Sequence, residues 1–430
     1  MKSNTQRSVA PYRFVVVGLG GYGLVHIDAI RWLAARGLAT LSGVVALELD
    51  RAAHPEMTAS LIREGVQLFD SVDHFLASGF SADILTIPVG IHMHVPLSVA
   101  AMRAGLNVYC EKPAAATVQE VDEMIAAQRN TGRTVAVGFQ HIYSHSIKQL
   151  KARIADGRLG AVRRATLYCG WPRSKQYYTR NEWAGKLSVG PHWILDSPAN
   201  NAHAHYLMNV LYLCGAGPAL AALPRKVRAE LYRANPIECP DTVQLKIELH
   251  DGAQIHCFLT HANSVPTGPS VRLECERGKI YWETDSGKTF IRYQNGKTED
   301  FDNFVHQKWR FDGFADLVIA LREGREPLCT PALARAQTLA INLMHESCPT
   351  VSQIPDEYVQ VVEDWEMFPP NTRGMFHRVR NLDEYMRIAI EEDAFLSDLG
   401  VVWATGEQSQ WFSAGEYRSY RASPGALPLR

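Results

Sequence analysis

Six residues near the N-terminus constrain the fold of this chain more than any other feature. The segment GLGGYG at residues 18–23 has the pattern G-x-G-x-x-G and follows the apolar run at residues 14–17. In a strand–turn–helix unit, Gly18 permits a tight turn, Gly20 lets the backbone approach a pyrophosphate, and Gly23 lets the helix pack closely on the strand. The N–H groups at the start of the helix favour an anion. The segment therefore predicts a dinucleotide-binding turn.

Strands and helices alternate from this turn to about residue 138. Further strands are expected at residues 44–49, 83–87, 106–109 and 134–138, with helices at 26–36 and 95–103. Apolar runs without polar alternation are typical of parallel strands buried on both faces. Right-handed crossovers between them lead to a doubly wound parallel sheet. Residues 1–145 are therefore expected to form a Rossmann dinucleotide-binding domain.

An acidic residue stands at the end of the predicted second strand. Glu48 lies about 25 residues after the last glycine of the motif. A carboxylate at this place accepts hydrogen bonds from the ribose hydroxyls of the cofactor and repels a 2′-phosphate. We therefore expect NAD rather than NADP, with Asp50 as an alternative acid. Arg51 is the one neighbour that suits the phosphorylated cofactor.

The pattern changes after about residue 145 to longer, partly alternating strands. These are expected at residues 163–169, 225–232, 242–249, 254–259, 271–274, 279–283 and 289–293, and helices at 203–213, 311–322 and 332–347. Turn signals such as Asp251-Gly252 connect neighbouring runs. We predict an α+β substrate-binding domain at residues 146–348, in which these helices cover one face of an open, mainly antiparallel sheet.

Residues 349–430 are predicted to be a C-terminal extension with one helix at 382–395. Three roles are open for this extension: it covers the active site, forms a subunit interface, or packs on the surface.

Composition limits the partners and the compartment. Lys and Arg number 44 against 45 Asp and Glu, so neither nucleic acid nor an anionic membrane is expected as a partner. No apolar stretch reaches the length of a membrane span, and the first residues lack the apolar core of a signal peptide. The eight cysteines are spread out without a C-x-x-C pair. This favours a reduced, cytoplasmic protein without structural zinc.

A second motif, Cys110-Glu111-Lys112-Pro113, follows the strand predicted at residues 106–109. An ammonium group at the carboxyl end of a parallel strand suits the stabilisation of an alkoxide as hydride leaves a substrate. Residues 83–113 resemble the glucose-fructose oxidoreductase and inositol dehydrogenase family (Gfo/Idh/MocA), and the resemblance extends over roughly residues 13–347. Pro88 and His92 match the family's proline and histidine after the fourth strand. The resemblance implies that Lys112 is catalytic and that the following proline is commonly cis.

The resemblance also implies an acid/base histidine in the second domain. In the family this residue ends the motif Asp-x-x-x-His, about ten residues before Leu-x-Gly, and counting back from Leu213-Cys214-Gly215 gives His205. The residue four positions earlier is Asn201 instead of aspartate. Either Asn201 or the nearby Asp196 takes the place of that aspartate. Where many members have an arginine after the sixth strand, Gln140 is expected to line the nicotinamide side.

The candidate site residues fall into three groups. Those expected to contact the cofactor are Gly18, Gly20, Gly21, Tyr22, Gly23, Glu48, Pro88, His92, Glu111, Lys112 and Gln140, and those expected to be catalytic are Lys112, His205, Asn201 and Asp196. Residues 177–185 mix aromatic rings with Arg and Asn, as polyol sites do, although an ordinary aromatic loop is an equal alternative. From this segment and one later strand, the candidates for substrate binding are Tyr178, Arg180, Asn181, Trp183 and His261. The pairs His92/His94 and His203/His205 do not have the spacing of metal ligands on one helix face, so no bound metal is expected.

These observations predict reversible hydride transfer between NAD and a secondary alcohol of a sugar, glycoside or cyclitol. Lys112 stabilises the alkoxide in this hypothesis, and His205 takes the proton. The open sheet is expected to be covered by another subunit in a homodimer or homotetramer. Two alternatives are redox-assisted glycoside cleavage or epimerisation in which NAD is recycled, and a catalytically inactive dinucleotide-binding regulator.

Overall fold

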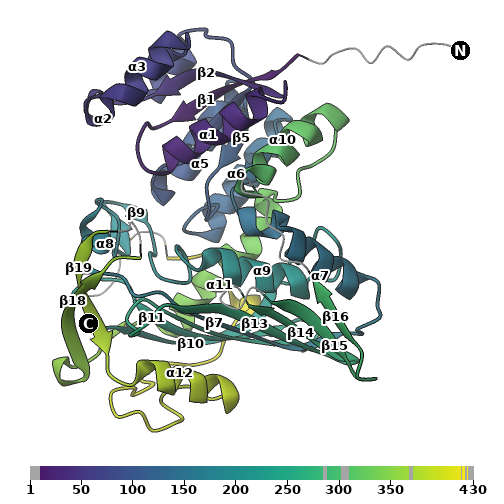
Figure 1. The fold of residues 1–430 in the computed structure, drawn as a ribbon, viewed down its shortest axis with the longest axis vertical. Coiled ribbons are helices and arrows are strands. Elements are labelled where there is room, and N and C mark those ends of the chain that lie inside the picture. Colours follow the sequence, from purple (N-terminus) through teal and green to yellow (C-terminus); the bar gives the residue numbers. More distant parts are fainter. Residues whose placement is uncertain are drawn as a thin grey trace, which may run out of the picture. The chain divides into compact units, whose positions relative to one another are not determined.

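The chain forms two compact units, each with its own sheet (Figure 1). The computed structural model describes residues 10–283, 288–301, 309–367, 371–417, 419–421 and 424. The first unit contains residues 10–115, 120–140 and 309–332, and the second contains the described parts of 116–119, 141–301 and 333–424.

The described strands of the first unit form one parallel sheet in the order β3-β2-β1-β4-β5-β6. The strands are β1 (Tyr12–Val17), β2 (Ala39–Val45), β3 (Gln67–Phe69), β4 (Ile84–Ile87), β5 (Asn107–Cys110) and β6 (Val135–Val137). The helices are α1 (Tyr22–Ala34), α2 (Glu48–Ala53), α3 (Pro55–Arg63), α4 (Val72–Ala77), α5 (Ile91–Arg103), α6 (Val118–Thr131) and α10 (Asp312–Glu323). This strand order confirms the predicted Rossmann fold, in which ligands bind at the carboxyl ends of the strands.

The second strand ends earlier than the sequence predicts. β2 stops at Val45, and Glu48 is the first residue of α2 instead of the last part of a strand. Leu47 and Leu49 are 58% and 82% exposed. Such exposure is incompatible with a strand that is covered on both faces, so the apolar run here does not mark a strand. Glu48 instead begins a helix, where a carboxylate interacts favourably with the helix dipole.

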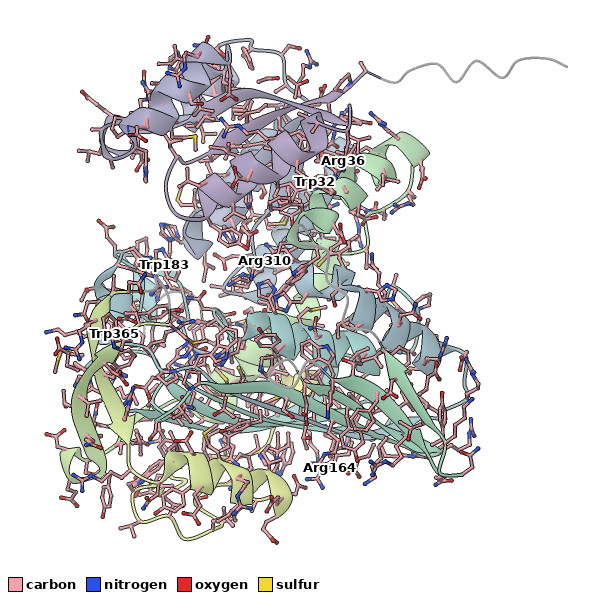
Figure 2. All side chains as sticks on the ribbon, in the orientation of Figure 1. Trp32, Arg36, Arg164, Trp183, Arg310 and Trp365 are labelled. Carbon is pink, nitrogen blue, oxygen red and sulfur yellow. The ribbon has the colours of Figure 1, made fainter. Side chains whose placement is uncertain are left out.

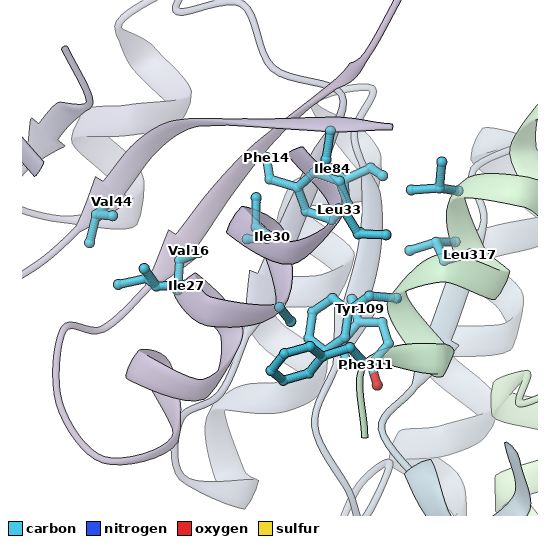
Figure 3. Packing of buried hydrophobic residues seen from close by; sticks show 14 of the residues in the cluster. Phe14, Val16, Ile27, Ile30, Leu33, Val44, Ile84, Tyr109, Phe311 and Leu317 are labelled. Atoms are coloured by element: carbon cyan, nitrogen blue, oxygen red, sulfur yellow. The ribbon is translucent and has the colours of Figure 1, made fainter. Parts of the chain in front are cut away.

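The helix predicted at residues 311–322 was assigned to the wrong sheet. It forms as α10, but it packs in the first unit, where the ring of Phe314 stacks on Tyr109 at 3.8 Å between centroids. Leu317 joins the same core as Ile30 and Leu33 of α1 (Figure 3). The spacing of apolar residues predicts which helix face is buried, but it does not identify the sheet that buries it.

The described strands of the second unit form a mixed sheet in the order β16-β15-β14-β13-β7-β12-β11-β10-β17, with β20 also paired to β10. β7 pairs in parallel with β12, and β10 with β17, while the other described neighbours are antiparallel. This confirms the predicted open, mainly antiparallel sheet. The bounds are β7 (Val162–Gly170), β10 (Pro224–Arg233), β11 (Thr242–Leu249), β12 (Gln254–Thr260), β13 (Thr267–Cys275), β14 (Gly278–Glu283), β15 (Thr289–Tyr293), β16 (Thr298–Phe301), β17 (Ser352–Gln353) and β20 (Phe412–Ser413).

Helices lie on both faces of this sheet (Figure 1). On one face lie α7 (His145–Ala155), α9 (Ala204–Cys214) and α11 (Pro331–Ser347), and on the other lies α12 (Leu382–Glu391). The described residues of this unit also form two small hairpins: β8 (Ser188–Val189) pairs with β9 (His192–Trp193), and β18 (Val359–Trp365) pairs with β19 (Arg373–Val379). The short helix α8 (Lys175–Thr179) packs beside β19.

The C-terminal extension covers part of the sheet face that the sequence assigned to a partner subunit. Leu382 and Met386 of α12 belong to one buried cluster with Tyr232 and Phe258 of the sheet. Oδ1 of Asp393, which follows α12, lies within hydrogen-bond distance of Nδ1 of His256 of β12, at 3.0 Å. The chain therefore shields this part of the face by itself, and the homo-oligomer remains a prediction.

Candidate functional site

The glycine motif forms the turn between β1 and α1. Gly18 has a φ of +94°, a conformation that favours glycine. A Cβ atom on Gly23 would lie 2.5 Å from the carbonyl oxygen of Gly18, so a larger residue does not fit without moving the turn. Within this described turn, no acidic residue and no side-chain cap occupies the start of α1. These features fit the pyrophosphate of a dinucleotide, because the helix N-terminus favours an anion.

His54 lies beside the same turn, although no sequence pattern indicated this position. A Cβ atom on Gly20 would lie 3.4 Å from Nε2 of His54. His54 follows α2, and with Arg63 it lines a hollow of about 680 Å³ in the first unit. The helix break between α2 and α3 brings this imidazole to the glycine turn.

Glu111 organises the carboxyl ends of β5 and β6. Its carboxylate is buried and accepts hydrogen bonds from Nε2 of Gln140 at 3.2 Å and from the backbone N–H of Lys112 at 3.1 Å. Nε2 of His26 lies 3.2 Å from the same carboxylate. A Cβ atom on Gly138 would lie 2.6 Å from Oε1 of Glu111, so glycine is needed there. The Glu-Lys-Pro motif thus places a buried anion that holds the backbone of the candidate catalytic lysine.

The glycine turn joins this network through Tyr22. Its hydroxyl lies 3.1 Å from Oε1 and 2.9 Å from Nε2 of Gln140. The structure therefore brings together Tyr22, Glu111, Lys112 and Gln140, which lie far apart in the sequence. Pro88 lies in the loop after β4, and Glu48 lies at the start of α2.

His94 connects two loops of the first unit, although the sequence singled out His92 two positions earlier. Its Nδ1 lies 2.8 Å from the carbonyl oxygen of Pro113, and its Nε2 lies 3.2 Å from that of Val89. Burial lowers the pKa of His94, so the neutral ring donates one N–H to these carbonyls. The Lys112–Pro113 peptide bond is cis, as the resemblance implied. His94 was detectable only as a polar residue on the buried face of a predicted helix.

In the second unit, His205 is the second residue of α9 and stacks on another histidine. The ring centroids of His205 and His141 are 4.3 Å apart, and the ring planes differ by 12°. Tyr206 also meets the ring of His141, edge to face, at 5.1 Å. His141 was not among the candidate site residues from the sequence. The structure instead gives the candidate acid/base residue a second imidazole as neighbour.

Asp196 and Asn201 lie side by side. Nδ2 of Asn201 donates to Oδ1 of Asp196 at 3.1 Å and to the hydroxyl of Tyr177 at 3.3 Å. Oδ2 of the buried Asp196 accepts the backbone N–H of Gly185 at 2.7 Å. The backbone carbonyl of Asn201 accepts the N–H of Ala204, the first residue of α9. Both candidates for the missing aspartate therefore lie at the start of the helix that carries His205.

The aromatic segment after α8 is packed by cation–π contacts. The guanidinium of Arg180 lies 3.6 Å from the ring centroid of Tyr177 and 5.2 Å from that of Trp183. Figure 2 shows Trp183 beside α8. Oδ1 of Asn181 accepts the backbone N–H groups of Trp183 and Ala184, at 3.2 and 2.8 Å. Asn181 thus shapes the local turn, while Arg180 and Trp183 present an aromatic and cationic surface.

His261 lies on the same side of the second unit as this segment. Its Nδ1 lies 2.9 Å from the carbonyl oxygen of Trp171, and its ring centroid lies 4.8 Å from that of His203 and 5.8 Å from that of Tyr177. Burial, reinforced by the charge of Arg173, lowers the pKa of His261 well below its usual value. The side chain is therefore neutral near pH 7 and acts through hydrogen bonds rather than charge.

Within the described ranges, His, Cys, Asp and Glu side chains do not gather in groups of three that would hold a metal ion. Among the helices of those same ranges, none combines the length and apolar character needed to cross a membrane.

The sequence of the first unit is similar to that of known oxidoreductases. Residues 12–139 match the model of the oxidoreductase family with an NAD-binding Rossmann fold. Inositol 2-dehydrogenase of Salmonella typhimurium is 30% identical over 145 residues, which cover 33% of this chain and 42% of the relative. D-glucoside 3-dehydrogenase of Escherichia coli is 28% identical over 149 residues, which cover 31% of this chain and 42% of the relative. The chain thus aligns with less than half the length of these relatives.

The likeness in fold extends further than the likeness in sequence. The WlbA dehydrogenase from Bordetella pertussis, solved with NADH and UDP-GlcNAcA, superposes with a TM-score of 0.65 at 22% identity. The superposition covers 79% of this chain and 97% of that protein. At this identity the likeness establishes the shared two-domain fold, and the ligands are those of the other protein.

Proposed function

We propose that this protein is an NAD-dependent dehydrogenase of a sugar, glycoside or cyclitol, because residues 12–139 match the model of the oxidoreductase family with an NAD-binding Rossmann fold. The observation that carries the proposal is the buried Glu111 network, which holds the backbone of Lys112 at the carboxyl end of a Rossmann strand. The names of the relatives from S. typhimurium and E. coli support a cyclitol or glucoside as substrate.

The residues present fit a dinucleotide. Gly18, Gly20, Gly23 and the start of α1 would hold the pyrophosphate, and Glu48 would accept hydrogen bonds from the adenosine ribose. A carboxylate at Glu48 favours NAD over NADP, because it repels a 2′-phosphate. Pro88, His92 and Gln140 would line the nicotinamide side, in addition to Gly21 and Tyr22 at the glycine turn. Bound NAD supplies the acceptor for the hydride that leaves the substrate carbon.

Lys112 stabilises the negative charge that develops on the substrate oxygen. Glu111 binds its backbone N–H, and His94 holds the carbonyl of the next residue, Pro113. These contacts fix the backbone that carries the ammonium group. A preorganised cation at the reacting oxygen lowers the barrier because it needs no reorganisation during the reaction.

His205 accepts the hydroxyl proton as the alcohol is oxidised and returns it in reduction. Asp196 supplies the negative charge that Asn201 lacks, and the amide of Asn201 fixes the position of that carboxylate. Tyr178, Arg180, Trp183 and His261 are proposed to bind the rest of the substrate.

The test follows NADH formation with NAD or NADP and a panel of inositols, sugars and glycosides, for the wild-type protein and for Lys112→Ala. We expect reduction of NAD by one substrate class and a loss of kcat of roughly 10²- to 10³-fold in the variant. The exposed Lys297, in the turn between β15 and β16, provides the matched control Lys297→Gln. If NAD binds without net reduction, cleaved or epimerised sugars support cofactor recycling, and unchanged sugars support a regulator.

A further inference from the structure

The second unit also contains a hollow, which lies beside the candidate substrate segment at residues 177–185. Its volume is about 510 Å³, within the range of small-molecule sites. Tyr178 and Gly185 contribute to its wall, and both belong to the segment that follows β7. Tyr178 also borders a smaller cavity with Asp196 and His261. Tyr178 therefore contributes to both the larger hollow and the cavity beside Asp196 and His261.

Positive charge dominates the wall of this hollow. Lys175, Lys186 and Arg233 contribute three cationic groups, against the single carboxylate of Glu238. That carboxylate accepts the backbone N–H of Leu187 at 3.2 Å. A pocket with an excess of positive charge attracts an anionic ligand and repels a cationic one.

Arg233 is held in place at this wall. Its Nη1 donates to the carbonyl oxygens of Ile237 and Glu238, at 2.7 and 3.1 Å, and its Nε donates to Oε1 of Gln353 at 3.0 Å. Gln353 belongs to β17 of the C-terminal extension. Of the hydrogen bonds described for this guanidinium, none uses Nη2. A planar group held by its other nitrogens is preorganised to bind a carboxylate or a phosphate.

Two buried polar groups of the wall lack a hydrogen-bond partner in the described part of the chain. Asn235 is 0% exposed, and its Nδ2 donates to Oδ2 of Asp241 at 2.8 Å, but its Oδ1 has no donor there. The hydroxyl of Tyr178, a residue only 8% exposed, is also without a partner there. Buried polar atoms are rarely left unpaired, because burial removes their hydrogen bonds to water.

Gly185 links this hollow to Asp196, which is a candidate catalytic carboxylate. Its φ is +76°, and a Cβ atom there would lie 2.9 Å from Cγ2 of Ile237. Its carbonyl oxygen accepts the N–H groups of Glu238 and Cys239, while its N–H donates to Asp196. Backbone contacts thus fix the hollow at a constant position relative to Asp196.

We propose that this hollow binds the acidic group of the substrate, so that the substrate is a sugar or polyol carrying a carboxylate or a phosphate. Lys175, Lys186 and Arg233 pair with the anion. The assignment of the ligand as substrate rests on the function proposed above, whereas anion binding in the hollow does not.

Calorimetric titration tests the binding directly. The probes are glucuronate, glucose 6-phosphate and neutral glucose, with the wild-type protein, the double variant Lys175→Gln/Lys186→Gln, and the control Lys297→Gln. We expect one acidic probe to bind more tightly than glucose, and the double variant to lose about three- to tenfold in affinity for it. The control keeps the wild-type affinity, and added salt weakens binding of the acidic probe alone. The tighter of the two acidic probes identifies the group.

NADH formation with the same probes separates this inference from the proposed function. Reduction of NAD by an acidic sugar, with KM raised and kcat kept in the double variant, supports both. Reduction by neutral sugars alone, with equal binding of all probes, overturns the acidic subsite and leaves the dehydrogenase standing. Selective binding of an acidic probe without NADH formation supports the anion site and counts against the dehydrogenase.

Discussion

Replacing Asp196 by asparagine distinguishes a carboxylate that assists His205 from one that only supports the fold. Asp196 is buried, and its carboxylate accepts hydrogen bonds from the N–H of Gly185 at 2.7 Å and from Nδ2 of Asn201 at 3.1 Å. An asparagine has nearly the same shape, but it has one acceptor oxygen and one donor amide. In the variant, the side-chain NH₂ group at position 196 therefore faces one of these two N–H donors and cannot accept its hydrogen bond.

The loss of folding stability in Asp196→Asn follows from these two hydrogen bonds. A hydrogen bond to a charged group contributes about 1.5–3 kcal/mol, and a neutral one about 1 kcal/mol. Losing one charged bond and weakening the other lowers the free energy of unfolding by about 2–4 kcal/mol. For a unit of this size, the melting temperature falls by roughly 5–12 °C.

The catalytic effect is separate from this cost. If Asp196 stabilises the imidazolium form of His205, Asp196→Asn lowers kcat by roughly 10- to 100-fold with little change in KM. The acid limb of the pH profile of kcat also moves to lower pH, because the imidazolium loses a stabilising charge. The assay is initial NADH formation across the pH range, alongside thermal unfolding. Glu182→Gln changes an exposed acid in the segment at residues 177–185 and serves as the matched control.

One result would refute this reasoning. If Asp196→Asn melts earlier but keeps the kcat and pH profile of the wild type, the carboxylate only holds Gly185 and Asn201 in place. The charge that assists His205 would then have to come from another residue.

Two further predictions concern cofactor binding and the C-terminal extension. Gly23→Ala is expected to raise the Kd for NAD about tenfold or more, measured by calorimetry, because its Cβ atom would lie 2.5 Å from the carbonyl of Gly18. Burial raises the pKa of Asp393, but its hydrogen bond to His256 and the charges of Lys246 and Arg164 outweigh this and lower the pKa to about 2. The ionised carboxylate therefore adds stability above pH 3.8 that is lost as the pH falls towards 2, and Asp393→Asn should flatten this part of the pH dependence of urea unfolding.

Local sequence patterns predict most of the elements of the fold. Alternating residues and turn signals predict β11 and β15 with the bounds that the structure has. The errors occur where long-range packing decides. The apolar Leu47 and Leu49 extend the run of β2, yet they are exposed because nothing packs on them. The helix α10 joins the first unit because the ring of Phe314 stacks on Tyr109, a residue more than two hundred positions away in the sequence.

The sequence identifies those candidate residues whose roles depend on a fixed spacing along the chain. The glycine turn and the Glu-Lys-Pro motif follow directly from the sequence, because their geometry is local. His94 and His141 were not predicted as site residues, since their contacts with Pro113 and His205 span distant parts of the chain. No spacing rule identifies a histidine whose partner is set by the packing of two loops.

The exchange of aspartate for Asn201 shows why a fixed-spacing motif is a poor test of lost activity. At that position the sequence lacks the carboxylate, which favours an inactive regulator. In space, the amide of Asn201 donates to Asp196, so a carboxylate remains next to the start of α9. A loop can supply the same charge from another position when a hydrogen bond fixes it there. The departure from the family pattern is therefore weak support for a regulator, and the kinetics of Asp196→Asn carry more weight than the motif.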